Sequence, residues 1–512
     1  LQEAGSILWQ DGTSLGYLRD ASPLAPEANF VREVDFCSGA FLLVRTDLLL
    51  RLDGFSDEFT PAYYEDADLC VRARQAGFKV VYDPGVVIHH YEYGSASSYH
   101  AVEALSARAR EVFVRRNDRH LRSRYARDRR AEIFARSADV ARRRILLIED
   151  QVPLRMLGSG FVRSNDLIRT MASLGLHVTV FPMQLGSFDP ASVYADMPET
   201  VEVMYDRSFN DLARFLEERD GYYDTIWIVR THNLDRVRPV LEPFVRRDRP
   251  PQIVLDAEAI ATIRESLRSP FSSGDNRRVR DEDIVLELRN ATFCQRIVAV
   301  SEGEAAEIRR LVSRDVSVIG HVREVALTQR SFEQRSGMLF LGAIHDETSP
   351  NLDSIRWFID EVLPLIEDVL GSETRLTVVG FMSEEVSLDG FRDHSRVTLL
   401  GPVADTRPLY DSHRLFIAPA RYAAGIPYKV HEAASVGLPV VATELLKNQL
   451  GWVNGEDLLS AEASEPSLFA AAVVRLYNDP LLWAKIRSGA ARRISDECTN
   501  ELFAHAVTAL LC

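Results

Sequence analysis

From Arg144 to the C-terminus, short apolar runs of strand length alternate with amphipathic helical patterns. Alternation of this kind is typical of a parallel sheet covered by helices on both faces, so we expect an α/β fold. The first series of runs is ILLIED (145–150), HVTVFP (177–182), TIWIVR (225–230), PQIVLD (251–256) and RIVAVS (296–301). The second is MLFLGAI (338–344), RLTVVG (375–380), VTLLG (397–401), LFIAPA (415–420) and PVVAT (439–443). Two successive series indicate two doubly wound, Rossmann-like domains.

Helices are predicted between these strands. One runs over 161–174 and is closed by Gly175, and others cover 351–369 and 428–437. The polar stretch over 322–336 marks the boundary between the two series. We therefore assign an N-terminal Rossmann-like domain to 141–325 and a C-terminal domain with further helices to 326–512.

The N-terminal region has a different pattern, which reads strand, helix, helix, strand. The run FCSGAFLLVR (36–45) predicts a strand, and TDLLLRLDGF (46–55) predicts a short helix with Thr46 as N-cap. YEDADLCVRARQAGF (64–78) predicts a helix that ends near Gly77. KVVYDPGVVIHHY (79–91) predicts two apolar segments around a Pro-Gly turn. A first domain over 1–100 is followed by an Arg-rich helical linker over 101–140.

Charge and cysteine usage narrow the function classes. The 512 residues are 46% hydrophobic and carry a net charge of −15, which argues against nucleic acid as a partner. Basic residues gather only in the run 116–144. That run reads as a solvated helix, or as a peripheral contact with an anionic membrane surface or an acidic partner.

The cysteines and the apolar runs bear on the compartment. Five scattered cysteines without CxxC spacing argue against a disulfide scaffold or a zinc ribbon. No apolar run reaches the roughly 20 residues of a membrane span. We expect a cytoplasmic protein, with the inner face of the membrane as an alternative. The chain opens with LQEAG and no Met, which suggests a piece of something longer.

Several landmarks of residues 1–100 follow one another in a fixed order: CSGAF, DGFSDEF, the ED-x-D of residues 65–68, and a His after a strand. This order resembles the C-terminal half of family 2 glycosyltransferases of the GT-A fold. The resemblance is to the version that precedes a GT-B domain in large bacterial polysaccharide and O-antigen transferases. It implies inverting sugar transfer with Asp66 as catalytic base, supported by Glu65 and Asp68. It also implies that His89 helps to hold Mg or Mn in a complete family 2 unit.

A structural reading of these carboxylates is also open. Acidic residues in the first turn of a helix are favoured by the helix dipole, and Asp68 can pair with Arg72 four residues on. Asp66-Ala67-Asp68 also spells DxD, the metal motif of GT-A enzymes, but that motif belongs in the nucleotide-binding half, upstream of SGA. Only some 35 residues precede Phe36, so we expect the N-terminal donor-binding half to be missing and this part to be inactive by itself.

The C-terminal Rossmann-like domain contains the segment APARYAAGIPYKVHEAASVGLPVVAT (418–443). This segment resembles GT-B glycosyltransferases of family 4. The resemblance implies a nucleotide-sugar donor and no metal cofactor. Glu432 matches the second Glu of the family's E-x7-E pattern, where the carboxylate binds the nucleotide ribose. The first Glu is replaced by Ala424, and the family's basic pair is absent near Ala343 and Thr348.

Other groups could meet the charge of a departing nucleoside diphosphate. Lys429 opens a helix after Gly425, so its ammonium and the helix N-terminus could both face phosphate. Arg421 lies on the same loop, and His345 lies in the loop after a predicted strand. Each of these has a plain reading as a surface or capping residue.

In the first Rossmann-like domain, Gly158, Ser159 and Gly160 open a helix and could let the backbone approach a sugar or phosphate. The alternative is a tight strand-to-helix turn, and Arg163 breaks the GxGxxG pattern. Asp256 and Glu258 follow a strand that faces the cleft, so we expect them on the acceptor side.

Together these features predict a glycosyltransferase of bacterial cell-surface polysaccharide or O-antigen assembly. Its GT-B unit would transfer a sugar from a nucleotide donor to a glycan or lipid-linked acceptor, with retention if it follows family 4. Two alternatives stay open: a degenerate scaffold for a partner transferase, and a GT-B sugar-nucleotide epimerase.

Overall fold

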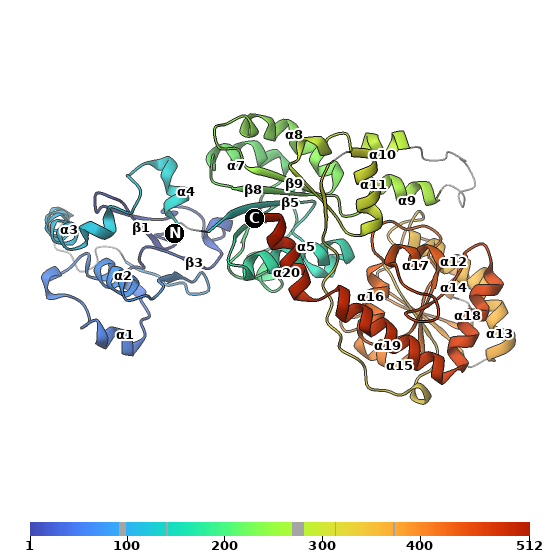
Figure 1. The fold of residues 1–512 in the computed structure, drawn as a ribbon. Helices are drawn as coiled ribbons and strands as arrows, with labels where there is room; N and C mark the ends of the chain where they lie inside the picture. The colour runs from blue at the N-terminus through green and yellow to red at the C-terminus, as the bar shows by residue number, and fades with distance from the viewer. Residues whose placement is uncertain are drawn as a thin grey trace. The chain divides into compact units, whose positions relative to one another are not determined.

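A computed structural model describes residues 1–91, 99–139, 142–268, 281–312, 314–371, 374–392 and 394–511 (Figure 1). By its contacts the chain divides into two compact units. The first comprises Leu1–Leu154, Met171–Ile228 and Val237–Gln252, and the second comprises Arg155–Thr170, Val229–Arg236 and Ile253–Cys512. These units do not follow the four predicted segments one for one, since residues 1–154 fall together in the first unit.

The N-terminal region is built on two small antiparallel pairs. β1 (Ser6–Leu8) pairs with β2 (Ser14–Gly16), and β3 (Arg32–Glu33) pairs with β4 (Val81–Tyr82). The predicted helix around the ED-x-D motif is present as α2 (Glu65–Gln75). Since ladders of only two or three residue pairs are weak, side-chain packing rather than sheet hydrogen bonding holds this region together.

The helix α3 (Tyr99–Leu121) contributes to that packing. Its residues Ala109, Phe113 and Leu121 are buried in one cluster with Phe59 and Val71. The first part of the predicted linker over 101–140 is therefore an element of the core of this region.

The strand predicted over 36–45 is wrong. A 3-10 turn, Gly39–Phe41, replaces it, and α1 begins directly at Thr46 (Thr46–Arg51) with Arg45 at the N-cap position. The run has a single bridge, between Ser6 and Phe36, and its Leu43 is 92% exposed. An apolar run forms a strand only where a neighbouring strand accepts its hydrogen bonds, and no strand of the described residues pairs with it beyond that bridge.

The first predicted Rossmann-like sheet is confirmed. Its seven strands have the order β11-β10-β9-β8-β5-β6-β7, and all the pairings described are parallel. The strands are β5 (Arg144–Glu149), β6 (His177–Pro182), β7 (Glu202–Val203), β8 (Thr225–Val229), β9 (Gln252–Asp256), β10 (Arg296–Ala299) and β11 (Val316–Val318). The helix after the Gly-Ser-Gly turn is α5 (Ser159–Ser173).

The second sheet is confirmed as well, with six parallel strands in the order β14-β13-β12-β15-β16-β17. They are β12 (Met338–Leu341), β13 (Leu376–Val379), β14 (Val397–Leu400), β15 (Leu415–Ala418), β16 (Val440–Thr443) and β17 (Leu459–Ala461). Met338 and Phe340 belong to one core cluster and Leu339 to the other, since successive side chains of a strand point to opposite faces.

Helices cover both faces of this second sheet (Figure 1). They are α12 (Pro350–Trp357), α13 (Leu363–Leu370), α16 (Tyr428–Ser435), α17 (Glu444–Leu450), α18 (Pro466–Asn478) and α19 (Pro480–Glu497). The last helix, α20 (Asn500–Leu511), instead contacts β11 of the first sheet. The single helix predicted over 351–369 is divided by a π-helical turn, Phe358–Val362. Pro364 at the start of α13 has no N–H to donate, so the regular hydrogen-bond ladder cannot continue through it.

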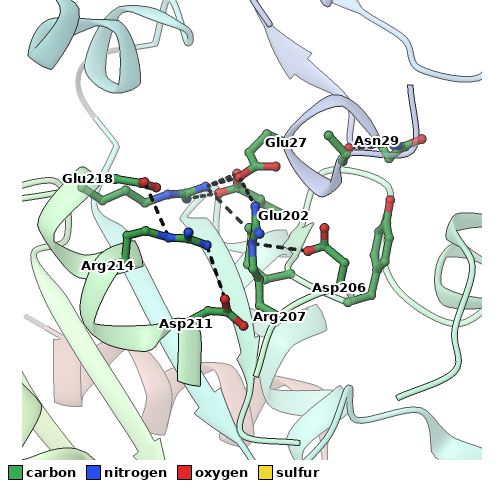
Figure 2. Close-up of polar contacts among 12 residues, drawn as sticks. Glu27, Asn29, Glu202, Asp206, Arg207, Asp211, Arg214 and Glu218 are labelled. Atoms are coloured by element: carbon green, nitrogen blue, oxygen red, sulfur yellow. Dashed lines mark hydrogen bonds and ion pairs between the residues drawn. The ribbon is translucent and has the colours of Figure 1, made fainter. Parts of the chain in front are cut away.

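A buried charge network joins segments of the first unit. Glu202 of β7 accepts hydrogen bonds at 2.6–2.9 Å from the guanidinium groups of Arg136 and Arg219. All three side chains are at most 5% exposed. Figure 2 shows the edge of this network, where Glu27 of the N-terminal region forms ion pairs with Arg207 at 3.7 Å and with Arg219 at 3.6 Å. The N-terminal region and β7 are thus held together by paired buried charges.

Candidate functional site

Strand ends of the first sheet bring polar residues together in the second unit. Arg163 of α5 donates to both carboxylate oxygens of Asp256, at the end of β9, at 3.0 and 2.9 Å. The same guanidinium donates to the carbonyl oxygens of Ile319 and Gly320. Arg163 and Asp256 are fully buried, so Asp256 has a structural partner that its position in the sequence did not reveal.

Arg230 and Glu258 form a second ion pair at these strand ends, with 2.8 Å between Nη1 and Oε2. Both residues have left-handed backbones, with φ of +76° and +54°. A non-glycine residue in this region costs of order 1 kcal/mol or more, and such residues cluster at functional sites. Both side chains are about one fifth exposed, which leaves their outer atoms accessible.

Gly160 of the predicted Gly-Ser-Gly turn lies against this pair. A Cβ at residue 160 would come within 2.3 Å of Glu258 Oε1 and 2.9 Å of Arg230 Nη2. Gly160 is therefore required by the ion pair. Gly158 has φ of +119° and precedes the helix, and the side chain of Ser159 lies outside the described part of the structure.

Glu304, in the first turn of α11 (Glu302–Val312), links this cluster to the loop before α16. Its Oε1 accepts from the backbone N–H of Gly425 at 3.1 Å and of Ile260 at 3.4 Å. Its Oε2 is buried without a partner among the described residues. Burial raises the pKa of Glu304 to about 7, against 4.5 for an ordinary glutamate, and the nearby charge of Glu258 adds to the shift.

Lys429, near the start of α16, donates to Asn351 Oδ1 at 2.5 Å. The Asn351 amide in turn donates to the carbonyl oxygen of Ala343 at 2.8 Å, at the end of β12. Burial lowers the pKa of the Lys429 ammonium to about 8. Lys429 is thus held at the carboxyl end of the second sheet, close to where the family's basic pair was expected.

Arg421 is engaged differently. Its Nε donates to Asp353 Oδ2 at 2.9 Å, and a second bond joins the same two side chains. Asp353 raises the pKa of Arg421 further, against the opposing effect of burial. The charge of Arg421 is therefore compensated within the protein.

Glu432 lies in the same helix as Lys429 and forms an ion pair with Arg323 at 3.2 Å. The guanidinium of Arg323 also binds the hydroxyl of Tyr428 and lies 4.5 Å from its ring centroid. The expected ribose-binding carboxylate is thus half-buried beside a cation. His345 stands apart from these groups; it is exposed, with its ring centroid 5.3 Å from that of Phe381.

Four residues of this site escaped sequence reasoning: Arg230, Glu304, Arg323 and Asn351. Arg230 is the last residue of a predicted strand, and that position could have pointed to it. No local sequence pattern distinguishes the other three, because the partners that matter here are distant in the chain. Lys429 lies 78 residues from Asn351, Gly425 lies 121 residues from Glu304, and Glu432 lies 109 residues from Arg323.

In the N-terminal region, Asp66 accepts from the backbone N–H of Gly39 at 2.8 Å, which brings the SGA turn onto the ED-x-D motif. Tyr63 and Tyr64, directly before α2, both have left-handed backbones. Glu65 is half-buried, its Oε2 has no hydrogen-bond partner among the described residues, and burial raises its pKa. These features concentrate backbone strain and carboxylates at the predicted base.

Asp68 is different, because it is fully buried. It pairs with Arg72 at 2.7 Å and Arg116 at 3.1 Å, and it accepts from Asn117 at 3.2 Å. These bonds join α2 to α3. The position of Asp68 is that of a structural ion pair, as the structural reading of the sequence allowed.

His89, the predicted metal ligand, is exposed. Within the described ranges, His, Cys, Asp and Glu side chains form no group of three or more suited to an ion. The metal role of His89 stays a prediction, and no step is assigned through Mg or Mn.

Two family comparisons bear on these sites. Residues 23–119 match the family described as "Glycosyltransferase like family 2", and residues 335–479 match "Glycosyl transferases group 1". Two separate stretches of the chain are thus similar to two glycosyltransferase families, and we call residues 23–119 the family 2 part and residues 335–479 the group 1 part. The family 2 part includes Asp66 and its surroundings, and the group 1 part includes Lys429, Glu432 and Asn351.

A curated relative matches the chain over a short stretch. It is rhamnosyltransferase WbbL of Escherichia coli (strain K12), 38% identical over 66 residues, or 13% of this chain. The chain spans about a quarter of the length of that relative.

Solved structures share the fold of the larger part. Sucrose-phosphate synthase from Thermosynechococcus elongatus superimposes with a TM-score of 0.57 at 16% identity, covering 72% of this chain and 98% of the other. Anabaena HepE, in complex with UDP and glucose, gives a TM-score of 0.52 at 15% identity, covering 72% and 99%. A glycosyltransferase from Rickettsia africae gives a TM-score of 0.52 at 12% identity, covering 72% and 98%. At such identities the likeness establishes the GT-B fold.

A search of the helices in the described ranges finds none with the length and apolarity needed to cross a bilayer.

Proposed function

We propose that the group 1 part transfers a sugar from a nucleotide donor to a glycan or lipid-linked acceptor in the assembly of a bacterial surface polysaccharide. The observation that carries this proposal is Lys429: a partly buried ammonium at the carboxyl end of a parallel sheet, bonded to a neutral amide. Ligands of open α/β sheets bind at this edge. A partly desolvated cation there suits the phosphates of a leaving nucleoside diphosphate.

The other polar groups of the site would contact either the donor or the acceptor. Glu432 and Tyr428, on the same helix as Lys429, offer polar atoms for the nucleotide ribose. On the other side, the Arg230–Glu258 pair presents a donor and an acceptor to sugar hydroxyls. Glu304 joins the two sides by fixing the backbone of Gly425. This arrangement would hold donor and acceptor in one reactive geometry.

The comparisons support the substrate class. The HepE structure contains UDP and glucose, and the curated relative is a rhamnosyltransferase. We carry over the class of donor, a nucleotide sugar. In the family 2 part, Asp66 is the proposed base of a separate inverting transfer. The Arg-rich run is the proposed peripheral membrane contact, on the cytoplasmic side.

Calorimetry tests the donor site. Wild type should bind one of UDP, GDP or dTDP at millimolar concentration. Lys429→Met should weaken that binding about tenfold or more, because a charge-assisted bond to phosphate is lost. Lys485→Met, an exposed lysine of α19, is the matched control and should bind like wild type. Silence of the wild type toward all three nucleotides would contradict the proposal and favour a scaffold.

Product analysis by NMR separates transferase from epimerase. The donor is a nucleotide sugar that carries the nucleotide found to bind by calorimetry. A transferase consumes this nucleotide sugar only when an acceptor glycan is present, apart from slow hydrolysis. Conversion to a second nucleotide sugar without acceptor would overturn the transferase assignment.

A further inference from the structure

We propose that Asn351 is a positioning residue that holds the Lys429 ammonium ready for the donor's phosphates while leaving its charge uncompensated. The inference rests on the proposed function of the group 1 part. It explains how the site works without the basic pair that the family resemblance led us to expect near Ala343 and Thr348.

The geometry of Asn351 fixes which way its amide faces. Its Nδ2 donates to the carbonyl oxygen of Ala343, and its Oδ1 accepts from Lys429 Nζ. The reverse orientation would place an N–H group against the ammonium and an oxygen against a carbonyl oxygen, so both bonds would be lost. One side chain thus ties the α16 lysine to the loop that follows β12.

The space around Asn351 is shaped to hold it. A Cβ on Gly342 would lie 2.7–2.9 Å from the Asn351 amide atoms, so residue 342 must lack a side chain. On the other side, Lys429 Nζ lies 4.5 Å from the centroid of the Phe340 ring, within reach of its negative face. Asn351 and Lys429 are therefore confined by the end of β12.

The charge arrangement is the main point. The first turn of α12 offers two side chains to two cations: Asn351 to Lys429, and Asp353 to Arg421. Asp353 cancels the charge of Arg421, whereas Asn351 supplies an oxygen dipole without a negative charge. No ion pair of Lys429 occurs among the described residues, and burial alone shifts its pKa. Of these two cations, Lys429 is therefore the one whose positive charge is left to interact with an incoming phosphate.

The neighbouring titratable groups are already engaged. Glu432, on the same helix as Lys429, pairs with Arg323, and Asp353 of α12 pairs with Arg421. His345, in the loop after β12, is exposed and lies against Phe381. Between pH 7 and 9, deprotonation of Lys429 is therefore the expected change at this end of the sheet. With a pKa of about 8, its charge falls to about one tenth of its full value by pH 9.

Calorimetry across this pH range tests the inference with the nucleotide that wild type binds best. Wild-type affinity should fall about tenfold between pH 7 and 9. Asn351→Asp should weaken binding at pH 7, because a carboxylate competes with phosphate, and should flatten the fall, because it raises the pKa of Lys429. Asn351→Leu keeps the size but removes the oxygen, so binding should weaken at all pH values. Asn448→Asp, at an exposed position of α17, controls for the added charge.

The outcomes separate the two proposals. Failure of wild type to bind any of the three nucleotides overturns the proposed function itself. Wild-type binding with a flat pH profile, and wild-type affinity in both Asn351→Asp and Asn351→Leu, overturns the role of Asn351 alone. Melting temperatures of both variants within a few degrees of wild type show that weaker binding is not caused by unfolding.

Discussion

Arg163 spans from α5 to Asp256 at the end of β9, and the same guanidinium bonds to the backbone of Ile319 and Gly320. The segment that begins there leads from the first sheet to the second. A single buried cation thus fixes the start of that connection.

Removal of one partner of this pair should be costly. Arg163→Met leaves a buried carboxylate without its cation, and we expect a loss of about 3–5 kcal/mol in the free energy of unfolding. Urea unfolding followed by circular dichroism measures it. The exposed pair of Arg309 with Glu302 is the control, because Arg309→Met should cost less than about 1 kcal/mol. Equal effects of the two substitutions would contradict the buried role of Arg163.

The Glu202 network predicts sensitivity to acid. Its two arginines hold the pKa of Glu202 well below the ordinary 4.5, despite burial. A lowered carboxylate pKa stabilises the fold above pH 4.5, and this contribution is lost as pH falls below that value. Glu202→Gln should therefore destabilise the protein at pH 7, and the difference from wild type should shrink below pH 4.5. Thermal melts at pH 7 and pH 4 measure it. A difference that does not change with pH would contradict the charge-based explanation.

For Glu304 we predict the opposite dependence of stability on pH. Its pKa of about 7 exceeds the ordinary 4.5, so the folded state binds a proton that the unfolded state releases between these values. The contribution of Glu304 to stability is therefore highest at low pH and falls as pH rises to about 7. Glu304→Gln keeps an oxygen for the N–H groups of Gly425 and Ile260 without the buried charge. We expect it to raise the melting temperature at pH 8 and to leave it unchanged near pH 4.5, and a lower value at pH 8 would contradict this.

Gly160 should be intolerant of even one methyl group. Gly160→Ala places a carbon within 2.3 Å of Glu258, so the Arg230–Glu258 pair must move. If that pair binds the acceptor, kcat/KM for transfer should fall about tenfold, while nucleotide affinity stays the same. Gly303→Ala is the control, because the nearest atom to its Cβ is 3.9 Å away. Unchanged transfer by Gly160→Ala would remove the Arg230–Glu258 pair from the acceptor site.

The sequence determined the two parallel sheets, because apolar runs and helical periodicity are local patterns that can be read without knowing which distant residues they contact. The same signals placed α2, α5 and α16, and with them Asp66, Gly160 and Lys429. They failed over 36–45, where an apolar run has no neighbouring strand to pair with and becomes a turn. A strand depends on its partner, and a single run carries no information about that partner.

The tertiary structure decided which charged residues remain available to a ligand. Arg421 and Lys429 read alike in the sequence as basic residues of one loop and helix start, yet one meets Asp353 and the other meets Asn351. Glu304 and Asp256 likewise acquire their roles from Gly425 and Arg163, which lie 121 and 93 residues away. Whether a charged side chain is neutralised by an opposite charge depends on the groups that folding brings within about 3 Å of it. Composition and sequence spacing give no information about those distances.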